Sequence, residues 1–484
     1  MAQQSPPLPG QREARISLVG TRSNVVDALD HGEAAFGSRF KWRARSSARA
    51  ANAAWVVKPK IAIVGTGIAG LTAAFRLRND AELTIFEANG RPGGHADTFD
   101  VTDPLGPLAI DTGFIVCNHE NYPTFMSLLD ELGVETQPSA MSFSVRRPQT
   151  GLEWESTGLG GLFANRRNLL SPRVWLMLKD MIKFNRLGQR DHLKLDDKCS
   201  VGDYLRRHRL GSAFRDDYLV PFGAAVWSCS GQSFLEFPMR FVLDFMSHHR
   251  MLAIRGRPKW RTVAGGSRTY VNALVSQLPP IRYDSPVDAV VRNDDGVTLS
   301  VCGDDCHFDE VILACHADQS LDMLKDADPD EKTVLSSIPF RKNIARLHHD
   351  SRALPTNKRC HASWNFRSGD GPEMPPSITY GMNILQRLPA AHDWSVTLND
   401  ERDIAPEKVA RTVEYEHPEF LPGSMGSRRR QMEFCRRRRT SFCGAWWGWG
   451  FHEDGCASGQ AVAASFGVCE APSLRGQTDS NQTD

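Results

Sequence analysis

The sequence of 484 residues contains no uninterrupted apolar stretch near the roughly 20 residues that a membrane-spanning helix requires. Its mean hydropathy is low, at -0.37. Hydrophobic residues make up 41% and charged residues 24%, which excludes a wholly disordered or collagen-like chain. We therefore expect a soluble, cytoplasmic globular protein with room for about three units of roughly 150 residues each.

An excess of charge of either sign is also missing. The chain has 58 Lys and Arg against 57 Asp and Glu, a formal charge of +1, which gives no long-range field for nucleic acid or an anionic membrane. Two local arginine runs, Arg428 to Arg430 and Arg436 to Arg439, stand out. Since no nucleic-acid module accompanies them, we expect a solvated basic surface or a peripheral contact with acidic lipid headgroups, and no nucleic-acid partner.

The cysteines do not form the dense pattern of a secreted disulfide scaffold. There are 11, an odd number, and they are widely scattered, so a reducing cytoplasm is the expected compartment. Cys302 and Cys306 could ligate a metal, but no second Cys or His pair lies nearby. We predict no metal site, and we find no internal repeat of fixed period.

The two ends of the chain differ from its centre. Residues 1–58 hold nine basic and four acidic side chains with only short apolar stretches. We expect a disordered leader there, either a dispensable or misassigned start or a transit peptide. The polar segment 468–484 is expected to be a disordered tail. The structured core is predicted to span 59–467.

Within this core, strand and helix patterns alternate. A strand is predicted over Lys60 to Val64, a helix over Ala69 to Leu77 and a second strand over Ala81 to Glu87. Later helices are predicted over 122–132, 174–187 and 240–249, and later strands over 287–292, 297–301, 309–314 and 394–398. This order favours an α/β nucleotide-binding domain interrupted by inserted segments.

A glycine-rich turn joins the first strand to the first helix. Gly65 permits the tight turn, Gly67 lets the backbone approach a pyrophosphate, and Gly70 allows close packing of the helix on the sheet. The helix N-terminus, with the amides of Ile68 and Ala69, offers its dipole to phosphates. The strand before the turn and the helix after it make the motif more specific than the glycines alone.

The second strand ends in a carboxylate. Glu87 lies about twenty residues after the turn, where it can accept hydrogen bonds from a ribose. This fingerprint alone is compatible with NAD(P) or FAD. The next segment, Gly90-Arg91-Pro-Gly93-Gly94-His95, adds exposed backbone amides and an arginine that can neutralise phosphate charge.

The run from Lys60 to His95 resembles the FAD-binding start of the flavin amine oxidase and phytoene desaturase superfamily. Further segments match this superfamily in order: Asp111 to Phe114, Trp260 to Ser267, Val311 to Ala317 and Phe442 to Gly455. More narrowly, they are similar to bacterial FAD-dependent oxidoreductases related to the amino-terminal flavoprotein half of plant cyclopropane fatty acid synthases. The resemblance covers about residues 60–466 and argues against an NAD(P)-dependent dehydrogenase, the rival interpretation of the first turn.

The resemblance implies a Rossmann-type FAD-binding domain with a parallel sheet and an inserted α+β substrate domain, amine-oxidase-like. The FAD-binding parts would be about 59–130, 258–322 and 436–467, and the substrate parts about 131–257 and 323–435. It places Gly65, Gly67 and Gly70 at the pyrophosphate and Glu87 on the adenosine ribose. The further residues expected at FAD are Arg91, Gly94, Val287, Gly444, Ala445 and Gly455. The family often has an acidic residue at the position of Ala445, so one contact to the cofactor would be missing.

Catalytic residues are less well defined. Amine oxidases of the superfamily often place a lysine near flavin N5, and none can be assigned between Lys342 and Asp350. The candidates are His348, Trp447 and His452, while His248-His249, Trp364-Asn365 and His452-Glu453 are candidates only to line the pocket. A Gly459 inside the last helix is unexpected, because an interior glycine costs about 1 kcal/mol relative to alanine.

We expect an FAD-dependent oxidoreductase that oxidises an apolar substrate, such as a fatty-acyl lipid, by hydride transfer to flavin. The glycine-rich aromatic segment from Trp446 to Phe451 could pack on the flavin or line a lipid channel. The alternatives are an amine oxidase and a non-catalytic flavin-binding partner of a lipid methyltransferase. The partners expected are thus a small-molecule or lipid substrate and, in the second alternative, such a methyltransferase.

Overall fold

A computed structural model describes residues 58–253, 256–369, 376–400, 402, 404–421 and 423–468. The chain divides into the units 1–48 and 49–484, and all described residues belong to the second. The predicted leader and tail therefore lie outside the described residues, except for Lys58 and Val468 at their inner ends.

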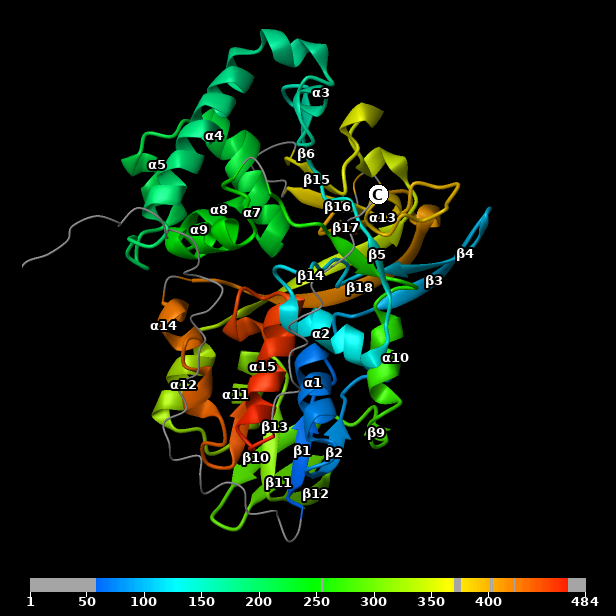
Figure 1. Cartoon of the computed structure of the whole chain (residues 1–484), viewed down its shortest axis with the longest axis vertical. Coiled ribbons are helices and arrows are strands. Elements are labelled where there is room, and N and C mark those ends of the chain that lie inside the picture. Colours follow the sequence, from blue (N-terminus) through cyan, green and yellow to red (C-terminus); the bar gives the residue numbers. More distant parts are fainter. Residues whose placement is uncertain are drawn as a thin grey trace, which may run out of the picture. The chain divides into compact units, whose positions relative to one another are not determined.

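A five-stranded parallel sheet organises one part of this unit (Figure 1). Its strands, in spatial order, are β19 (Thr440–Phe442), β13 (Glu310–Leu313), β1 (Lys60–Val64), β2 (Glu82–Phe86) and β9 (Ile281–Arg282). All neighbours pair in parallel. The predicted Rossmann-type sheet is confirmed, and its strands come from three segments that are far apart in the sequence. The predicted domain boundaries themselves stay a prediction.

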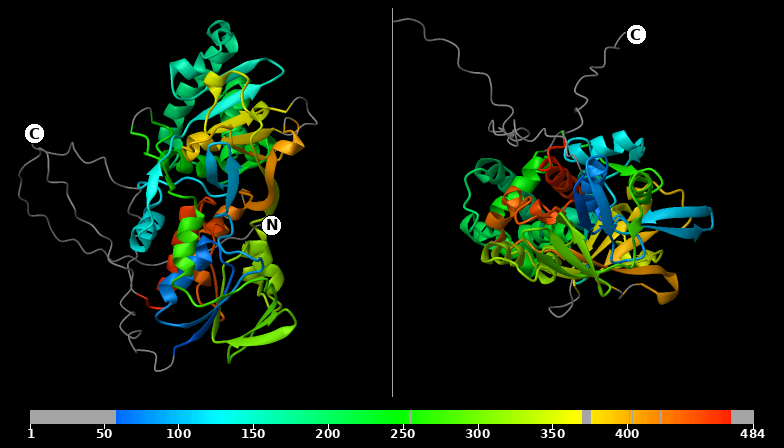
Figure 2. Two further views of the ribbon diagram at one scale, coloured as in Figure 1. Left: turned by 90° about the vertical axis from the view of Figure 1, so that its right-hand side faces the viewer. Right: turned by 90° about the horizontal axis from the view of Figure 1, so that it is seen from below.

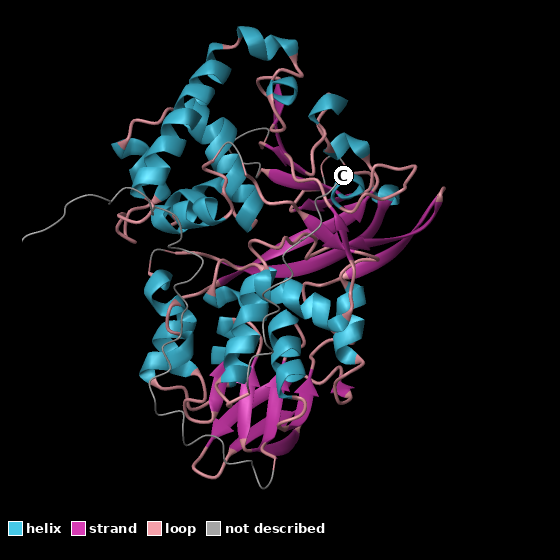
Figure 3. Ribbon diagram, in the orientation of Figure 1, coloured by secondary structure: helices cyan, strands magenta, loops and turns pink. Residues whose placement is uncertain are grey.

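The two faces of the sheet are covered differently, because successive side chains of a strand point to opposite sides. Ile61 and Ile63 pack against helices α1 (Ile68–Leu77) and α15 (His452–Ala464). Ala62 and Val64 face a three-stranded antiparallel sheet of β10 (Val287–Arg292), β11 (Val297–Val301) and β12 (Asp304–Phe308). Figure 3 shows these helices and strands as separate layers.

The contact between α1 and α15 explains the unexpected Gly459. A Cβ atom at this position would lie 2.2 Å from the Ala69 carbonyl oxygen. Only glycine lets the two helices approach so closely, so the loss in helix propensity is offset by packing. The sequence pattern of one helix could not show this, because Ala69 belongs to the other end of the chain.

The second part contains a seven-stranded sheet and a group of helices, which Figure 2 shows from two further sides. The sheet order is β18 (Val409–Pro418), β14 (Phe340–His348), β17 (Ser395–Leu398), β16 (Ser377–Gly381), β15 (Trp364–Arg367), β6 (Phe143–Arg147) and β7 (Leu152–Glu155). The helices are α3 (Leu159–Leu162), α4 (Pro172–Asp191), α5 (Val201–Arg207), α6 (Ser212–Phe214), α7 (Val220–Trp227), α8 (Gly231–Glu236) and α9 (Met239–His248). The 3-10 helix η2 (Arg166–Leu170) precedes α4. The helix predicted over 174–187 is thus longer than expected.

The remaining elements connect these parts. They are β3 (Thr98–Asp103), β4 (Gly106–Asp111), α2 (Pro123–Leu132), β5 (Thr136–Pro138), β8 (Arg261–Val263), α10 (Arg268–Val275), α11 (Ala317–Met323), α12 (Pro329–Ser336), α13 (Met382–Leu385), α14 (Ser424–Arg428) and the 3-10 helix η8 (Ala445–Trp447). Strands β3 and β4 form an antiparallel ribbon, as do β5 and β8. Among the described residues, no helix combines the length and the apolar character needed to cross a bilayer.

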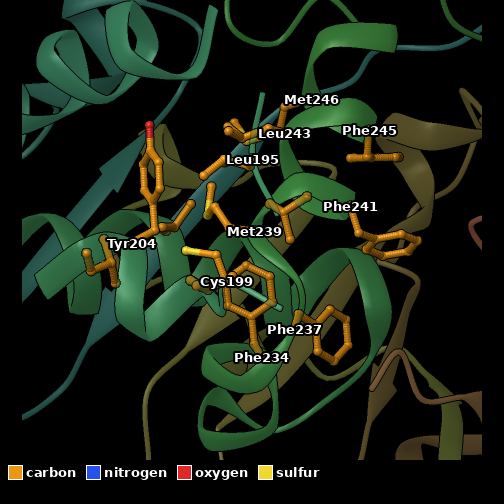
Figure 4. Close-up of a cluster of buried hydrophobic side chains, with 14 of the residues drawn as sticks. Leu195, Cys199, Tyr204, Phe234, Phe237, Met239, Phe241, Leu243, Phe245 and Met246 are labelled. Carbon is orange, nitrogen blue, oxygen red and sulfur yellow. The ribbon is translucent and has the colours of Figure 1, made fainter. Parts of the chain in front are cut away.

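An aromatic core holds the helices of the second part together (Figure 4). On α9, Met239, Val242 and Met246 recur at helical spacing on the buried side. The ring of Phe237 lies 5.7 Å from that of Trp227, and the two meet edge to face. Burial of several such rings, each worth roughly 1.5–3 kcal/mol, fixes the wall against which the cavity described below is built.

The two arginine runs are mostly paired with acids, so much of their charge is compensated, and the predicted basic surface or lipid contact there stays a prediction. Arg430 makes two hydrogen bonds to Asp330, at 2.8 and 2.9 Å. Further ion pairs join Arg436 to Glu310, Arg437 to Asp328 and Asp330, and Arg438 to Asp326. Arg428 is buried over the Phe420 ring and donates from Nε to the Trp446 carbonyl. The acids lie about 100 residues earlier, where sequence proximity could not reveal them.

Candidate active site

A cavity of about 1740 Å³ reaches from the first strand-to-helix turn to the helices of the second part. This volume exceeds the roughly 300–1,000 Å³ of a typical small-molecule pocket, so it has room for more than one ligand. Ten of the predicted cofactor residues line it: Gly65, Gly67, Ile68, Ala69, Glu87, Arg91, Gly94, Val287, Gly444 and Ala445. Gly70 and Gly455 do not.

The turn after β1 has the geometry that the sequence predicts. Gly65 has a φ of 102°, and its amide donates to the Phe86 carbonyl at 2.9 Å. Gly67 precedes α1, and a Cβ there would meet nothing within 4 Å. This open space lies at the helix N-terminus, where unpaired amides and the helix dipole favour a phosphate.

Two of the predicted glycines serve packing instead. A Cβ at Gly70 would lie 2.0 Å from the Gly65 carbonyl oxygen, and one at Gly455 would lie 2.8 Å from Ile68 Cγ2. Gly70 thus has the helix-packing role that the motif predicts, although it does not touch the cavity. Gly455 keeps α15 close to the start of α1.

Glu87 is buried and already engaged. Its Oε2 accepts hydrogen bonds from the amide and hydroxyl of Thr66, and its Oε1 from the backbone and side-chain amides of Asn89. These four bonds orient the carboxylate in the cavity wall. A ribose hydroxyl would share one of these oxygens with the Thr66 hydroxyl or the Asn89 side chain, both of which can turn away.

Arg91 lies along the same wall, and its charge is only partly compensated. The guanidinium donates to the Gly94 carbonyl at 3.0 Å and lies 3.1 Å from the Asp97 carboxylate, which also binds Arg411. Since Asp97 is shared between two arginines, positive charge still predominates at this point. An anionic phosphate group is therefore compatible with it.

The late motif brings Gly444 and Ala445 to the cavity without an acidic partner. Of the two nearby acids, Glu453 accepts from the backbone amides of Thr124 and Phe125 at 2.9 Å, and Asp454 accepts from those of Trp449 and Phe451. Burial raises the pKa of Glu453 to about 7. Both carboxylates are used to hold backbone segments, so neither replaces the acid that the family often has at position 445.

The three catalytic candidates differ in whether they line the cavity. His348 is buried, and its two ring nitrogens bind the Thr397 hydroxyl and the Asp350 amide. Trp447 donates from Nε1 to the Phe442 carbonyl. Neither residue lines the cavity. His452 does, but its Nε2 is bound to the Tyr270 hydroxyl at 2.7 Å and its ring stacks on Phe114. Burial lowers the pKa of His452 to about 3, so a neutral, structural imidazole fits best.

Of the paired candidates for the pocket wall, one member of each pair lines the cavity. These are His249, Trp364 and His452, whereas His248, Asn365 and Glu453 do not line it. The aromatic segment is divided in a similar way. Trp446, Trp449 and Phe451 line the cavity, while Trp447 is turned into the core.

A histidine cluster with no predicted role lines the cavity: His95, His316 and His417, together with Tyr415. His95 stacks on Tyr415 with ring centroids 5.0 Å apart, and its ring lies 5.2 Å from that of His417. The His95 Nε2 atom is buried and has no hydrogen-bond partner among the described residues. Burial, and then the neighbouring His316, lower the pKa of His95 to about 4.

Two members of the cluster lie in segments that the sequence singled out: His95 directly follows Gly93-Gly94 in the predicted phosphate loop, and His316 lies between Val311 and Ala317. Tyr415 and His417 come from β18, more than 300 residues later. A buried nitrogen without a partner is costly unless a ligand satisfies it. The cluster thus marks a position where a polar edge of a bound molecule fits.

Beyond this cluster the cavity wall becomes apolar. It is lined by Phe143, Trp154, Met177, Met181, Phe222 and Trp227, among others. We call this region the distal chamber. The charged side chains in its neighbourhood are Glu155 and Arg257. Among the described lining residues of the whole cavity, the one lysine is Lys325, whose backbone amide donates to the Val290 carbonyl on β10.

Comparison with known proteins decides the family. The sequence profile of the flavin containing amine oxidoreductases matches residues 68–351, more than half of the chain. The chain belongs to this family. Membership assigns FAD as the cofactor and sets aside the NAD(P)-dependent alternative. The narrower resemblance to flavoproteins related to cyclopropane fatty acid synthases stays a prediction.

Relatives within and around the family are distant. An L-amino-acid oxidase from Siganus canaliculatus is 25% identical over 325 residues, which cover 60% of this chain and 55% of that protein. The chain therefore spans about half the length of this curated relative. A fatty acid isomerase from P. acnes that produces CLA aligns with a TM-score of 0.59 and 17% identity, over 84% of this chain and 98% of that one. A cyclohexylamine oxidase from Brevibacterium oxydans aligns with a TM-score of 0.62 and 15% identity, over 84% and 98%. These two structures share the fold.

The residues present fit FAD. The open helix N-terminus at Gly67 can hold a pyrophosphate, Glu87 is oriented toward the cavity, and the orphan Nε2 of His95 lies farther along the same wall. The assignment of individual residues to parts of FAD remains a proposal.

Proposed function

We propose that the protein is an FAD-dependent oxidoreductase that oxidises a long, apolar acyl-chain substrate held in the distal chamber. The observation that carries this proposal is the composition of that chamber, with its methionine and aromatic walls. A chain in such a chamber gains about 0.8 kcal/mol for each buried CH₂ without dedicated polar ligands. Methionine side chains suit this task, because they adapt to a flexible ligand.

At the cofactor end, the chain's own groups bind and orient. The amides at the start of α1 hold the pyrophosphate, and Glu87 holds the adenosine ribose. When bound, FAD supplies the acceptor for a hydride from a substrate C–H bond. His95, which is neutral near pH 7, can donate or accept one hydrogen bond through Nε2. The apolar walls of the distal chamber exclude water from the reacting atoms.

The fold neighbours include enzymes named for both substrate classes, a fatty acid isomerase and a cyclohexylamine oxidase. The lining of the cavity favours the first class. The lysine expected in many amine oxidases has no counterpart between Lys342 and Asp350, since Lys342 is exposed and paired with Glu414 at 2.8 Å. No observation on the described residues supports a lipid methyltransferase partner, so we leave it out of the proposal.

Amine oxidation remains the second candidate, because one feature favours it. Glu155, on β7, is buried beside the distal chamber, where a carboxylate could hold a substrate ammonium. Both of its oxygens, however, already accept hydrogen bonds from Thr157. A substrate ammonium would therefore have to compete with the hydrogen bonds from Thr157, whereas an acyl chain needs no carboxylate partner.

Anaerobic stopped-flow mixing separates the two candidates. The FAD-loaded protein is mixed with phospholipids or free fatty acids that carry unsaturated chains and, separately, with primary amines and L-amino acids. Bleaching of the flavin absorbance by a lipid, but by no amine, is the expected result. Bleaching by amines alone would reverse the assignment. Glu155→Gln serves as the matched variant, since it should abolish reaction with an amine and leave reaction with a lipid nearly unchanged.

A further inference from the structure

The outer side of η2 and α4 carries an unusual concentration of exposed apolar side chains. Of the 11 large hydrophobic residues that are exposed in the described part of the chain, seven lie between residues 159 and 193: Leu159, Leu169, Leu170, Trp175, Leu176, Ile182 and Leu193. Leu170 is 87% exposed and Trp175 51%. We call the surface formed by Leu169, Leu170, Trp175, Leu176 and Ile182 the η2–α4 face. Figure 1 shows α3 and α4 at the end of the second part that is farther from the parallel sheet.

The charges around this face all have one sign. Between residues 159 and 194, every exposed charged side chain is basic: Arg166, Arg167, Lys179, Lys183, Arg186, Arg190 and Lys194. Lys179 and Lys183 follow Leu176 at spacings of three and seven residues, and Arg186 follows Ile182 at a spacing of four, so they share the outer side of α4. Acids on this helix turn elsewhere, since Asp180 accepts from the Gly211 amide and Asp191 pairs with Arg190.

The face is held in a fixed shape. The indole nitrogen of Trp175 donates to the Leu169 carbonyl at 2.9 Å, which ties α4 to η2. The ring of Phe163 lies 5.6 Å from that of Trp175 and supports it from the inner side. The apolar side chains are thus presented to the outside by a rigid base, and their exposure is not the result of a loose loop.

The same helix forms part of the cavity wall. Met177, Leu178, Met181 and Asn185 line the distal chamber from the inner side of α4. Leu159, on α3, both lines the cavity and is 74% exposed. The cavity therefore reaches the outside next to the η2–α4 face.

We propose that the η2–α4 face docks on the surface of an anionic lipid bilayer and that an acyl-chain substrate enters the distal chamber from this bilayer between α3 and α4. Apolar side chains surrounded by Lys and Arg, with no exposed acid among them, match the interface of such a membrane. The entry route rests on the proposed function, whereas the docking itself does not depend on it.

A second copy of the chain is a poorer occupant. In a two-fold dimer the same patch meets itself, which would bring Lys179 and Arg186 of the two copies together. Like charges placed face to face oppose association. The arginine runs at 428–430 and 436–439 are also excluded as the docking surface, because Asp326, Asp330 and Glu310 already pair with them.

Co-sedimentation of the FAD-loaded, full-length protein with vesicles tests the docking. The vesicles contain phosphatidylcholine alone or phosphatidylcholine with an equal amount of phosphatidylglycerol. We expect binding to the second kind, weakened by salt. The double variant Leu170→Ser, Leu176→Ser and the double variant Lys179→Glu, Arg186→Glu should each reduce the partition coefficient about tenfold or more. Their matched controls, Leu105→Ser in the exposed β3–β4 turn and Lys332→Glu on α12, should bind as the wild type does.

Three results would overturn the docking: no sedimentation with either kind of vesicle, equal loss of binding in the controls, or concentration-dependent self-association that the Leu170→Ser, Leu176→Ser variant abolishes without any vesicle binding. The flavin spectrum of each variant shows that the fold is retained.

Turnover tests the entry route separately. The Leu170→Ser, Leu176→Ser variant should reduce its flavin slowly with lipid in vesicles and at the wild-type rate with the same lipid in detergent micelles. Equal rates in both forms would overturn the route. If vesicles bind but no lipid reduces the flavin, the proposed function fails while the docking stands.

Discussion

Different parts of the polypeptide form the two ends of the cavity. At the cofactor end, backbone groups and glycines within one short stretch, residues 65–94, form part of the wall together with 285–288, 314–316 and 444–446. At the substrate end, side chains from β6, β7, α4, α7 and α9 converge from distant parts of the chain. Where the backbone itself forms the wall, an added side chain would occupy the space of the ligand. Where side chains form the wall, one of them can be replaced without moving the others. At the cofactor end, substitutions that add a side chain to a glycine should therefore act in an all-or-none way, whereas substitutions at the substrate end should have graded effects.

The largest effect is expected at Gly67. Gly67→Val places a branched side chain in the open space at the start of α1, where a phosphate would lie. The purified variant should contain no FAD, as measured by its absorbance and by chromatography of the denatured protein. Gly426→Val is the matched control, because a Cβ there also meets nothing within 4 Å. A variant at Gly67 that is as yellow as the wild type would show that the turn does not bind the cofactor.

A substitution at Gly459 tests how strongly the cofactor end depends on α15. Gly459→Leu forces α15 away from the Ala69 carbonyl and should lower the free energy of unfolding by about 1–3 kcal/mol or more. Chemical denaturation of the FAD-free protein measures this. Ala464→Leu, on an exposed position of the same helix, should change it little. Equal stability of both variants would contradict the close approach of α1 and α15.

Glu87 gives a graded test at the same end. Glu87→Ala should weaken FAD binding by about 1–3 kcal/mol, because a charged acceptor is lost and the Thr66 amide is left without its partner. Glu87→Gln keeps one carbonyl oxygen and should lose less. Titration of the FAD-free protein, followed by flavin fluorescence, gives both affinities. Identical affinities for the two variants and the wild type would remove Glu87 from the site.

The histidine cluster between the two ends predicts a pH dependence. Burial lowers the pKa of His95 and His316 to about 4 and that of His417 to about 3, whereas each is near 6.5 in an unfolded chain. The unfolded chain therefore binds more protons below pH ~6.5, so stability is fully present above this pH and falls as the pH drops toward 4. His417→Gln should make this loss shallower by roughly 1–2 kcal/mol. Denaturation midpoints measured from pH 7.5 to 4.5 test it, with the exposed His119→Gln as control.

The smallest effect is expected in the distal chamber. Met181→Ser removes part of the apolar wall and should raise the half-saturating concentration of a lipid substrate about three- to tenfold, since about 1 kcal/mol of apolar contact is lost. The FAD content should stay unchanged. Met432→Ser, at an exposed position outside the cavity, is the control. Loss of FAD from the Met181 variant would mean that the two ends are not separable.

The difference between the cofactor end and the substrate end also explains what the sequence could predict. Gly65, Gly67 and Glu87 act within one strand-helix-strand unit, so their spacing carries the information. The distal chamber and Tyr415 depend on which strands pair, and no short motif encodes this pairing.

The basic residues show most clearly what the sequence alone could not predict. The run from Arg436 to Arg439 is conspicuous in the sequence, yet Arg436 and Arg438 meet acids more than 100 residues away in the chain. Lys179 and Lys183 belong to no run, yet both are exposed on α4 beside apolar side chains. Whether a basic side chain is compensated depends on the tertiary fold, and the density of charge along the sequence does not show it.

The contact between α1 and α15 also has a consequence for biosynthesis. The Thr72 hydroxyl lies 3.5 Å from the sulfur of Cys456, a residue 384 positions later. At about 5–20 residues per second, a ribosome needs on the order of 20–80 s to deliver the second helix after the first has emerged. During this time α1 lacks the helix that covers its apolar side. The nascent chain therefore leaves this apolar side of α1 without its partner helix for most of its synthesis, and the cofactor site is complete only after translation of α15.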